Sequence, residues 1–437
     1  PDAVARLSEG IVLGTAEYQG EKVEVRVPLP DRLTHVNIIG KTGTGKSTLL
    51  HHLIDQDIRA GRGVAVIDPH GKLVRDVLRT SIPERREQDV VVLDLAQGDY
   101  PPPLNPLAGM GSYTGTLKVV GLIERLFAGT ERAARMASFL RAALVPLQAY
   151  PEATMRDVAR MFMDDVFRHE RLATVDDPET EDFWEFQYNA ASPALRRQIA
   201  EPVINRIRPF YANAHLYPML CHPSALDFRA LMRQGKIILI SLAMDEEQVP
   251  EQERNLIGAL LVSRLQLAVS KEVLQQPFFV YIDEVQKFVT TSLNELFSEA
   301  RKYHLSLVTA NQYLGQLAGK TLEAIMGNVG CSIIFPCSPD DASALAAYTR
   351  PNFTAQQLIE LDRSEAVVKT QIHGRTLPAF SLFAWAPLSP APDASEREQR
   401  IRARSVAAYT PRSRADVVAW LRERYQRGAP GAQVEAA

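Results

Sequence analysis

The segment IIGKTGTGKSTLL, residues 38–50, constrains the fold of this chain more than any other stretch. It contains the pattern G-x-x-x-x-G-K-[ST], which forms a phosphate-binding loop when a strand precedes it and a helix follows. Both conditions are met, because the apolar run THVNIIG predicts a strand and leucines and isoleucines at helical spacing predict a helix from Lys46 to about Ala60. This context argues against the alternative, a glycine-rich turn without a ligand.

Each part of this loop has a distinct chemical task. Glycines let backbone N–H groups close around phosphate oxygens, and the helix N-terminus adds a partial positive charge. Lys46 is expected to reach the β- and γ-phosphates, and Ser47 to hold Mg²⁺. We therefore predict ATP and Mg²⁺ as the bound groups. The predicted nucleotide contacts in the loop are Gly40, Thr42, Gly43, Thr44, Gly45, Lys46, Ser47 and Thr48.

A second apolar run, FFVYIDE, ends in the acidic pair Asp283 and Glu284. At the end of a strand beside a phosphate loop, Asp283 is suited to orient Mg²⁺, and Glu284 to polarise the attacking water as general base. The pair alone is equally consistent with a helix N-cap. Together with the phosphate loop, it predicts nucleotide hydrolysis.

Two polar residues follow the acidic pair in the segment SEARKYHLSLVTANQ. Gln312 stands at the C-terminal end of the next predicted strand, where a side chain faces the ligand crevice, so we predict a γ-phosphate sensor. Arg301 stands at a helix end. It is interpreted either as a cation that complements the helix dipole or as an arginine finger that reaches a neighbouring subunit's site.

The segment VIDPHGKL places Asp68 at the end of another predicted strand. Its D-x-x-G pattern is found in GTPase switch segments, but the chain has no N-K-x-D motif for reading guanine. We therefore expect Asp68 to act near the nucleotide by tuning Mg²⁺ or the attacking water. His70 is interpreted as a loop residue rather than a catalytic one, because no carboxylate partner is evident.

The rest of the chain divides by its pattern of apolar residues into an α/β fold with a helical insertion. Residues 11–28 alternate around a Gln-Gly turn and predict a β-hairpin, whereas GVAVIDPHG, DVVVLDL and KIILISL are typical of a parallel sheet covered on both faces. Aromatic residues in DFWEFQY are expected in the core of a helical bundle. The predicted ranges are an N-terminal β-hairpin region 1–30, an α/β domain in two parts 31–112 and 233–390, an all-α insertion domain 113–232 and a C-terminal helical tail 391–437.

Composition sets limits on the setting of the protein. The chain of 437 residues is too long for one simple core, and its net charge of -3 means that any nucleic-acid contact has to come from a local patch. Three cysteines without CxxC spacing argue against a zinc site or disulfides and favour a cytoplasmic setting. No apolar run reaches the roughly 18–20 residues of a membrane span. Because the chain begins at Pro1 rather than Met, membrane association through a removed N-terminal anchor stays an alternative.

Six segments in a fixed order resemble the HerA/FtsK superfamily of hexameric DNA-pumping ATPases. They are the phosphate loop, IDPHG, YIDE, ARKYHLSLVTANQ, NVGCSIIFPCSPDDASALA and HGRTLPAF. Within the superfamily, the chain is most similar to conjugative coupling proteins of the TraD/TraG type and to HerA, from roughly Ile11 to Pro387. The helical insertion looks like the all-α domain of those coupling proteins.

The resemblance implies a RecA-like P-loop motor domain that assembles as a homohexamer around a central channel, with ATP at subunit interfaces. By position, the resemblance implies that Lys46 binds phosphate, that Ser47 and Asp283 bind Mg²⁺, and that Glu284 is the hydrolytic acid. It implies that Gln312 is the γ-phosphate sensor and that Arg301 acts on the site of a neighbouring subunit. Arg375, in HGRTLPAF, is expected to approach the nucleotide from the end of the sheet. The chain departs from the family in two respects: its N-terminal region is shorter than the barrel of HerA proteins, and no membrane helices precede the motor.

The expected function is ATP-driven DNA translocation through a ring, in conjugation or another form of DNA transfer. The alternatives are a HerA-like translocase that processes DNA ends with a nuclease, an NTP-operated switch and a small-molecule kinase, for which no acceptor pocket is found. DNA is expected to bind through its phosphates without sequence readout, and a relaxase, a nuclease or a secretion channel is the expected partner. The DNA-binding residues considered are Lys72, Arg75, Arg196 and Arg197, although each of them taken alone is more typical of a solvated charged surface.

Overall fold

The computed structural model describes residues 9–108, 113–126, 133–269, 273–317 and 319–426. The chain forms two compact units, each built from several segments. The sheet unit contains residues 1–94, 227–243 and 261–406, and the helical unit contains residues 95–226, 244–260 and 407–437. This division differs from the five consecutive ranges predicted from the sequence, because the chain passes between the units several times.

The sheet unit holds one mixed sheet of 12 strands among the described residues. The strand order is β2-β1-β12-β10-β9-β3-β8-β7-β4-β6-β5, and β11 pairs with β10. From β9 to β5 all neighbours are parallel, whereas the strands from β2 to β10 pair antiparallel. The strands are β1 (Ile11–Tyr18), β2 (Glu21–Val27), β3 (Val36–Ile39), β4 (Gly63–Asp68), β5 (Val90–Asp94), β6 (Ile237–Ser241), β7 (Phe278–Ile282), β8 (Leu305–Asn311), β9 (Cys331–Ile334), β10 (Glu365–Ile372), β11 (Arg375–Thr376) and β12 (Phe380–Phe383).

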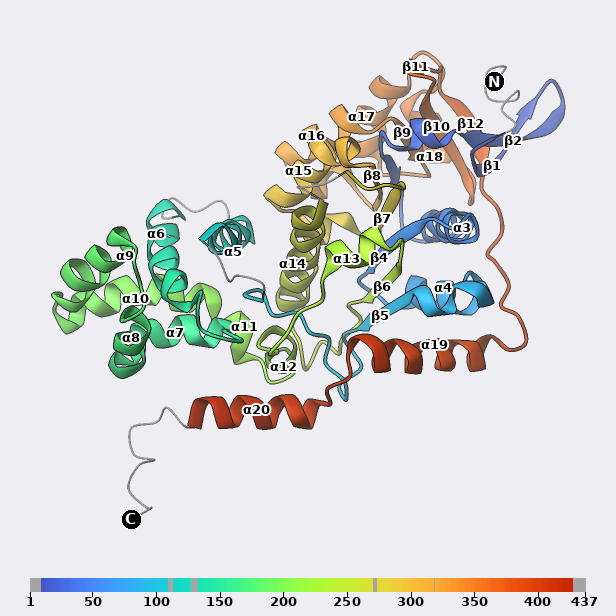
Figure 1. The fold of residues 1–437 in the computed structure, drawn as a ribbon. Coiled ribbons are helices and arrows are strands. Elements are labelled where there is room, and N and C mark those ends of the chain that lie inside the picture. The colour runs from blue at the N-terminus through green and yellow to red at the C-terminus, as the bar shows by residue number, and fades with distance from the viewer. Residues whose placement is uncertain (1–8, 109–112, 127–132, 270–272, 318, 427–437) are drawn as a thin grey trace. The chain divides into compact units, whose positions relative to one another are not determined.

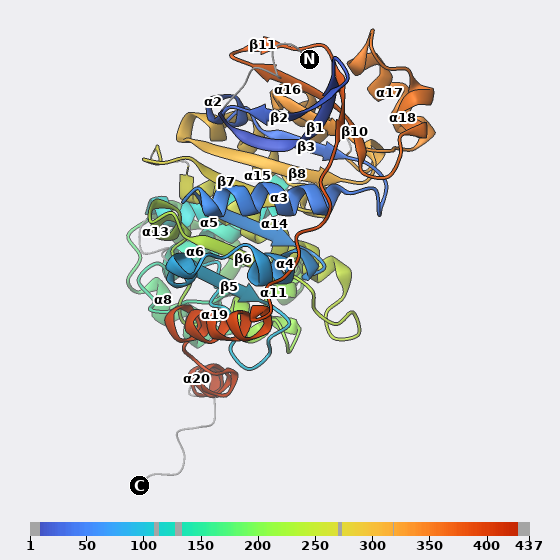
Figure 2. The same cartoon turned by 90° about the vertical axis from the view of Figure 1, so that its right-hand side faces the viewer.

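Helices cover both faces of the parallel strands, as Figures 1 and 2 show for α3 and α4 on one face and α15 and α16 on the other. Strands β4, β6, β7 and β8 are buried along their whole length, which explains why their sequences are almost continuously apolar. The helices of this unit are α2 (Leu29–Arg32), α3 (Lys46–Arg59), α4 (Lys72–Thr80), α13 (Phe228–Arg233), α15 (Thr291–Glu299), α16 (Lys320–Asn328), α17 (Pro339–Thr349), α18 (Ala355–Glu360) and α19 (Ala394–Tyr409).

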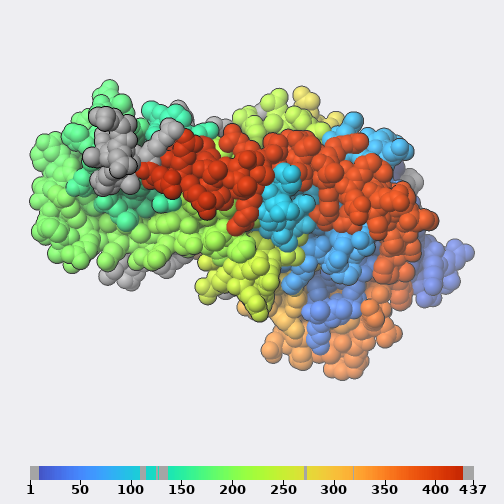
Figure 3. Space-filling model, turned by 90° about the horizontal axis from the view of Figure 1, so that it is seen from below, coloured from blue at the N-terminus to red at the C-terminus, as the bar shows by residue number. Residues whose placement is uncertain are grey.

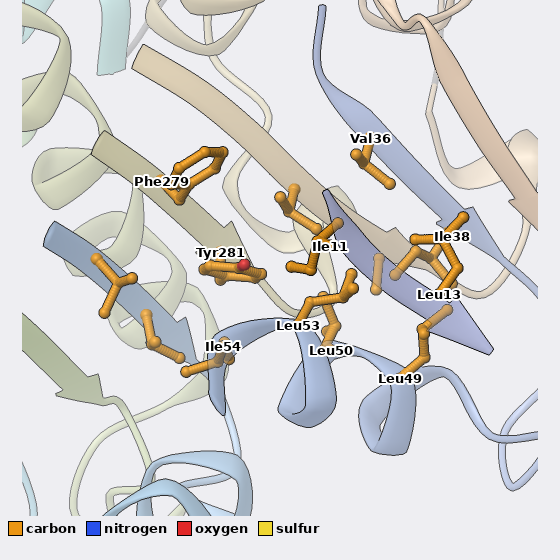
Figure 4. Close-up of a cluster of buried hydrophobic side chains, with 14 of the residues drawn as sticks. Ile11, Leu13, Val36, Ile38, Leu49, Leu50, Leu53, Ile54, Phe279 and Tyr281 are labelled. Carbon is orange, nitrogen blue, oxygen red and sulfur yellow. The ribbon is translucent and has the colours of Figure 1, made fainter. Parts of the chain in front are cut away.

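The predicted N-terminal hairpin forms from β1 and β2 and continues the sheet through β12. Helix α3, which follows the phosphate loop, packs against the sheet. Its side chains Leu49, Leu50, Leu53 and Ile54 point toward the strands in Figure 4. These positions recur at helical spacing, so one side of α3 is apolar and fully buried. Burial of this side fixes the position of the phosphate loop on the sheet.

The helical unit contains no strand among its described residues, apart from an isolated bridge between Leu104 and Ala225. Trp184 and Tyr188 of the predicted aromatic core are buried, and the Trp184 indole Nε1 donates to the Ala142 carbonyl over 2.9 Å. Its helices are α5 (Tyr113–Leu126), α6 (Ala133–Leu144), α7 (Met155–Met163), α8 (Asp165–Leu172), α9 (Pro178–Asp182), α10 (Pro193–Ile207), α11 (Pro209–Ala212), α12 (Tyr217–Leu220) and α20 (Arg414–Gln426), while α14 (Glu251–Val269) begins here and ends in the sheet unit. None of the described helices has the length and apolarity needed to cross a membrane.

Helix α19 belongs to the sheet unit, although the sequence predicted one tail over 391–437. In Figure 3, its red residues lie against the light-blue residues of α4. Ion pairs hold it, among them those between Arg79 and Glu398, Arg400 and Glu87, and Arg402 and Asp94, at 2.7, 2.6 and 2.8 Å. The Ser405 hydroxyl also accepts a 2.7 Å hydrogen bond from the Val92 backbone N–H of β5.

A buried polar network joins the phosphate-loop helix to the strand that carries the acidic pair. The Arg32 guanidinium donates two hydrogen bonds to the Asp57 carboxylate on α3, at 2.7 and 2.9 Å, and the Tyr281 hydroxyl on β7 donates to the same carboxylate. All three side chains are essentially inaccessible to solvent. Because the charges are paired and hydrogen-bonded, the network is tolerated inside the sheet unit.

Replacing Asp57 by alanine is expected to lower the free energy of unfolding by about 3–5 kcal/mol, because Arg32 would be left as an uncompensated buried charge. Asp55→Ala is the matched control on the same helix. Asp55 pairs with Arg59, whose side chain is mostly exposed, so its loss is expected to cost less than about 1 kcal/mol. Urea unfolding of both variants measures the difference; equal losses would contradict the role of the network.

Candidate functional site

The phosphate loop connects the buried strand β3 to α3, and its glycines are required by its shape. Gly40 has a φ of 156°, and a Cβ at this position would lie 2.5 Å from the Phe335 Cβ. Gly45, immediately before α3, has a φ of 121°, in a region that residues with a side chain rarely adopt. The sequence pattern thus produces a loop whose backbone N–H groups gather at the start of a 14-residue helix.

Lys46 is buried at the start of α3, with its side chain turned back along the loop. Its ammonium lies against the carbonyl oxygens of Gly40 and Lys41, the latter at 2.8 Å. Burial lowers the pKa of Lys46, opposed by the negative charges of Asp283 and Glu284. A triphosphate would supply further negative charge to this ammonium, which suits the predicted phosphate-binding role.

The acidic pair follows β7, which is separated from β3 by β8 alone. This arrangement brings the Ser47 hydroxyl within 3.2 Å of the Asp283 carboxylate, to which it donates. The two residues are 236 positions apart in sequence. The predicted pairing of phosphate loop and acidic strand end is therefore seen in space.

The pair Ser47 and Asp283 fits Mg²⁺, which prefers oxygen ligands and keeps several waters and substrate phosphates in its shell. Burial, and next the charges of Asp68 and Glu284, raise the pKa of Asp283 to about 6. A cation beside Asp283 would reverse this effect and keep its carboxylate ionised. No cluster of three or more His, Cys, Asp or Glu side chains suited to a metal occurs among the described residues, so the fit rests on a few protein oxygens.

Glu284 is held by three side chains from three segments. It accepts one hydrogen bond from the Gln312 amide at 2.7 Å and forms ion pairs with His70 and Lys287, each at 3.1 Å. The hydrogen bond from His70, followed by Lys287, lowers the pKa of Glu284 to about 2, although burial opposes the shift. The carboxylate is thus ionised and oriented beside the phosphate loop, as a residue that positions a water must be.

His70 lies in the loop between β4 and α4, as predicted, but it has a carboxylate partner, Glu284, that was not evident from the sequence. His70 lies after β4 and Glu284 after β7, and these strands are parallel neighbours, so their ends meet at one edge of the sheet. The hydrogen bond to Glu284 raises the pKa of His70. No local signal in the sequence shows this partnership, because it depends on the strand order.

Asp68 lies at the same edge but is engaged with the backbone. Its two carboxylate oxygens accept hydrogen bonds from the N–H groups of His70 and Val74, at 2.8 and 3.1 Å, and so shape the start of α4. Asp68 is 1% exposed and does not line the cavity described below. Its charge acts on the site through Asp283.

A cavity of about 490 Å³ lies over the phosphate loop and the ends of β7 and β8. Of the residues predicted from the sequence, it is lined by Thr42, Gly43, Gly45, Lys46, Ser47, Thr48, Asp283, Glu284 and Gln312. The residues that sequence reasoning missed are His70, Asn311, Arg363, Ser364, Trp385, Ala386 and Pro387. The structure therefore gathers the phosphate loop, the acidic pair and the sensor in one place and adds a wall from the C-terminal part of the sheet unit.

Arg375 does not reach this cavity in its own chain. Strand β10 is antiparallel to β9, so it begins beside the cavity and ends at the opposite edge of the sheet. Arg375 pairs with Ile372 at that far end, so within its own chain it lies away from the predicted nucleotide site. Arg363, just before β10, lines the cavity instead.

Arg301 also lies far from the cavity of its own chain. It precedes the N-terminal end of β8, whereas Gln312 follows the C-terminal end of that strand. Seven strand residues at about 3.3 Å each separate the two by roughly 23 Å. The Arg301 side chain is exposed, so any contact with a nucleotide requires a second subunit.

Comparison with solved structures finds the same fold. The plasmid coupling protein TrwB in complex with ADP and Mg²⁺ matches with a TM-score of 0.65 at 15% identity, over 90% of this chain and 94% of that chain. TrwB in complex with the non-hydrolysable GTP analogue GDPNP gives 0.64 at 15% identity, over 90% and 94%. VirB4 of Thermoanaerobacter pseudethanolicus gives 0.60 at 15% identity, over 90% and 99%. These matches confirm the predicted α/β fold of a P-loop NTPase with a helical insertion.

A comparison with curated protein sequences found no match. The sequence model described as "Helicase HerA, central domain" matches residues 11–265. This range covers more than half of the chain and includes the phosphate loop. The protein therefore belongs to the family of the HerA helicase central domain.

Proposed function

We propose that the protein is an ATPase that drives DNA through the channel of a homohexameric ring. The observation that carries the proposal is the contact between Glu284 and Gln312 beside the phosphate loop. It joins a water-orienting carboxylate to an amide that can sense the γ-phosphate, across neighbouring strands β7 and β8. Such a pair supports repeated hydrolysis rather than slow switching.

In this mechanism Lys46 and the loop N–H groups would hold the β- and γ-phosphates, and Ser47 and Asp283 would hold Mg²⁺. The metal, when bound, neutralises charge that develops on the transferred phosphoryl group. Glu284 orients the attacking water, and Gln312 couples the presence of the γ-phosphate to the position of Glu284. Asp68 adjusts the electrostatics of the metal ligand through its charge.

Two settings for DNA translocation have support. The match to TrwB extends over both the sheet unit and the helical unit, which favours DNA transfer with a relaxase or secretion channel as partner. The family match favours a HerA-like translocase that processes DNA ends with a nuclease. An ATPase assay with and without single- and double-stranded DNA, with a mass measurement of the assembled particle, tests motor and ring together. Turnover unaffected by either DNA, in a monomer, would overturn the proposal.

DNA binding is expected to weaken steeply with salt, because contacts to phosphates release counterions. Arg197 is exposed on α10, whereas the neighbouring Arg196 guanidinium donates to the carbonyls of Tyr188 and Ala191, at 3.1 and 3.2 Å. Arg197→Ala is therefore expected to reduce the slope of log affinity against log salt by about 1, and Arg196→Ala to leave the slope unchanged. Fluorescence anisotropy with labelled DNA from 50 to 200 mM salt measures both. A wild-type affinity independent of salt would exclude phosphate contacts.

A further inference from the structure

The cavity has a wall that the catalytic role leaves unused. It is formed by Trp385, Ala386 and Pro387, which follow β12. We propose that the Trp385 indole is the surface on which the base of the bound nucleotide stacks. This inference rests on the proposed ATP site and adds how that site recognises the base.

Trp385 contacts α3 about one turn beyond the phosphate loop, which places it at the end of the cavity away from the hydrolytic residues. Thr48 and His52 are four residues apart on α3 and so lie on one side of the helix. The Trp385 ring meets His52 edge to face, with centroids 5.3 Å apart and an angle of 77° between the rings. Ser47, in contrast, contacts Asp283. The cavity therefore extends from the acidic pair, past the phosphate loop, to Thr48 and Trp385.

Hydrogen bonds on both sides of Trp385 fix its backbone relative to the phosphate loop. The Ala384 N–H donates to the Ser364 carbonyl at 2.8 Å, and the Ser364 N–H donates to the Thr44 carbonyl at 3.0 Å. On the other side, the His52 ring Nε2 contacts the Ala386 carbonyl oxygen at 2.7 Å. The distance between the phosphate cradle and the indole is thus set by the fold, which allows one bound molecule to contact both.

The chemistry of this wall suits a flat, uncharged ring. An indole offers a wide apolar face, and every nucleobase has a π-face that stacks on it. Pro387 and the methyl group of Ala386 extend the apolar surface beside the ring. Because stacking reads the face of a base and not its edge, we expect ATP and GTP to bind with similar affinity, and the smaller pyrimidines of CTP and UTP to bind more weakly.

Intrinsic fluorescence gives a direct test, because the chain has three tryptophans, Trp184, Trp385 and Trp420. Nucleotide binding to the wild-type protein is expected to quench tryptophan emission, and Trp385→Phe is expected to abolish the quench while keeping most of the affinity through its own aromatic ring. Trp420→Phe, on α20 of the helical unit, is the matched control and should retain the quench. A quench that persists in Trp385→Phe would overturn the inference.

A comparison of ATP with inorganic tripolyphosphate separates the base site from the phosphate site. Calorimetry is expected to show that Trp385→Ala binds ATP about 10- to 100-fold more weakly than wild type does. Its affinity for tripolyphosphate should be unchanged, which would also show that the phosphate loop is intact. Lys46→Ala should lose both ligands. Equal ATP affinity in Trp385→Ala and wild type would overturn the stacking role alone, whereas a wild-type protein that binds neither ligand would overturn the proposed ATP site itself.

Discussion

The Glu284→Gln protein is expected to bind ATP as tightly as wild type and to hydrolyse it on the order of 10² to 10⁴ times more slowly. The amide keeps the size of the side chain and can still accept the hydrogen bond from Gln312, but it cannot orient and activate water as a carboxylate does. The phosphate loop is untouched, so the nucleotide stays bound. Retention of radiolabelled ATP on filters and steady-state turnover measure the two quantities.

Two control variants test whether the effect of Glu284→Gln is specific. Lys46→Ala should neither retain ATP nor turn it over, because the buried ammonium at the phosphate loop is gone. Glu323→Gln removes an exposed carboxylate on α16 and should leave both measurements unchanged. If Glu284→Gln turned over ATP at the wild-type rate, another group would have to activate the water, and the assignment of Glu284 would be wrong.

Arg301→Ala is expected to leave ATP binding intact and to slow hydrolysis by on the order of 10³ to 10⁵, the effect of an arginine that stabilises charge on the transferring phosphoryl group. Because Arg301 lies at the opposite end of β8 from its own cavity, the effect requires a neighbouring subunit. If Arg301 only complements a helix end, its removal should cost no more than about 1 kcal/mol of stability and leave turnover nearly intact. Lys302→Ala, the adjacent exposed cation in the same turn, is the matched control.

Mixing two inactive proteins decides whether Arg301 acts between subunits. Arg301→Ala chains still carry Glu284, and Glu284→Gln chains still carry Arg301. Rings that contain both chains will include some interfaces with both groups intact, so hydrolysis should return on mixing. Proven co-assembly without recovered turnover would show that the two groups do not meet across an interface.

The parts of the site that lie at the ends of parallel strands could be predicted from the sequence. Apolar runs that end in Asp283 or Gln312 share a direction, so their polar ends had to meet at the edge where the phosphate loop also stands. The position of Arg375 could not be predicted in this way, because β10 runs antiparallel. The residues after β10 therefore lie away from the cavity of their own chain, while Arg363, before β10, lines it. Strand direction in this part of the sheet has no signature in the apolar pattern.

Other features could not be predicted because they depend on contacts between segments distant in the chain. The His70 side chain finds Glu284 only through the adjacency of β4 and β7. Trp385 reaches α3 through a segment 333 residues later than His52, as their ring contact shows. The division of the C-terminal tail has the same origin: ion pairs of Arg400 and Arg402 attach α19 to the sheet unit, while Val417 and Leu421 bury the face of α20 near Cys221.

Helix α19 has a consequence for the solubility of the protein. Strand β5 is an edge strand of the sheet. An apolar edge strand has unpaired backbone N–H and C=O groups that can pair with a strand of another protein molecule. The Val92 N–H of β5 already donates a hydrogen bond to the Ser405 hydroxyl of α19. Helix α19 therefore covers this edge and prevents intermolecular strand addition. The other margin, β2, has no such cover in the described structure and instead carries alternating charges at Lys22, Glu24 and Arg26, which discourage the same pairing. A chain that ended before α19 would therefore be expected to aggregate through β5 rather than through β2.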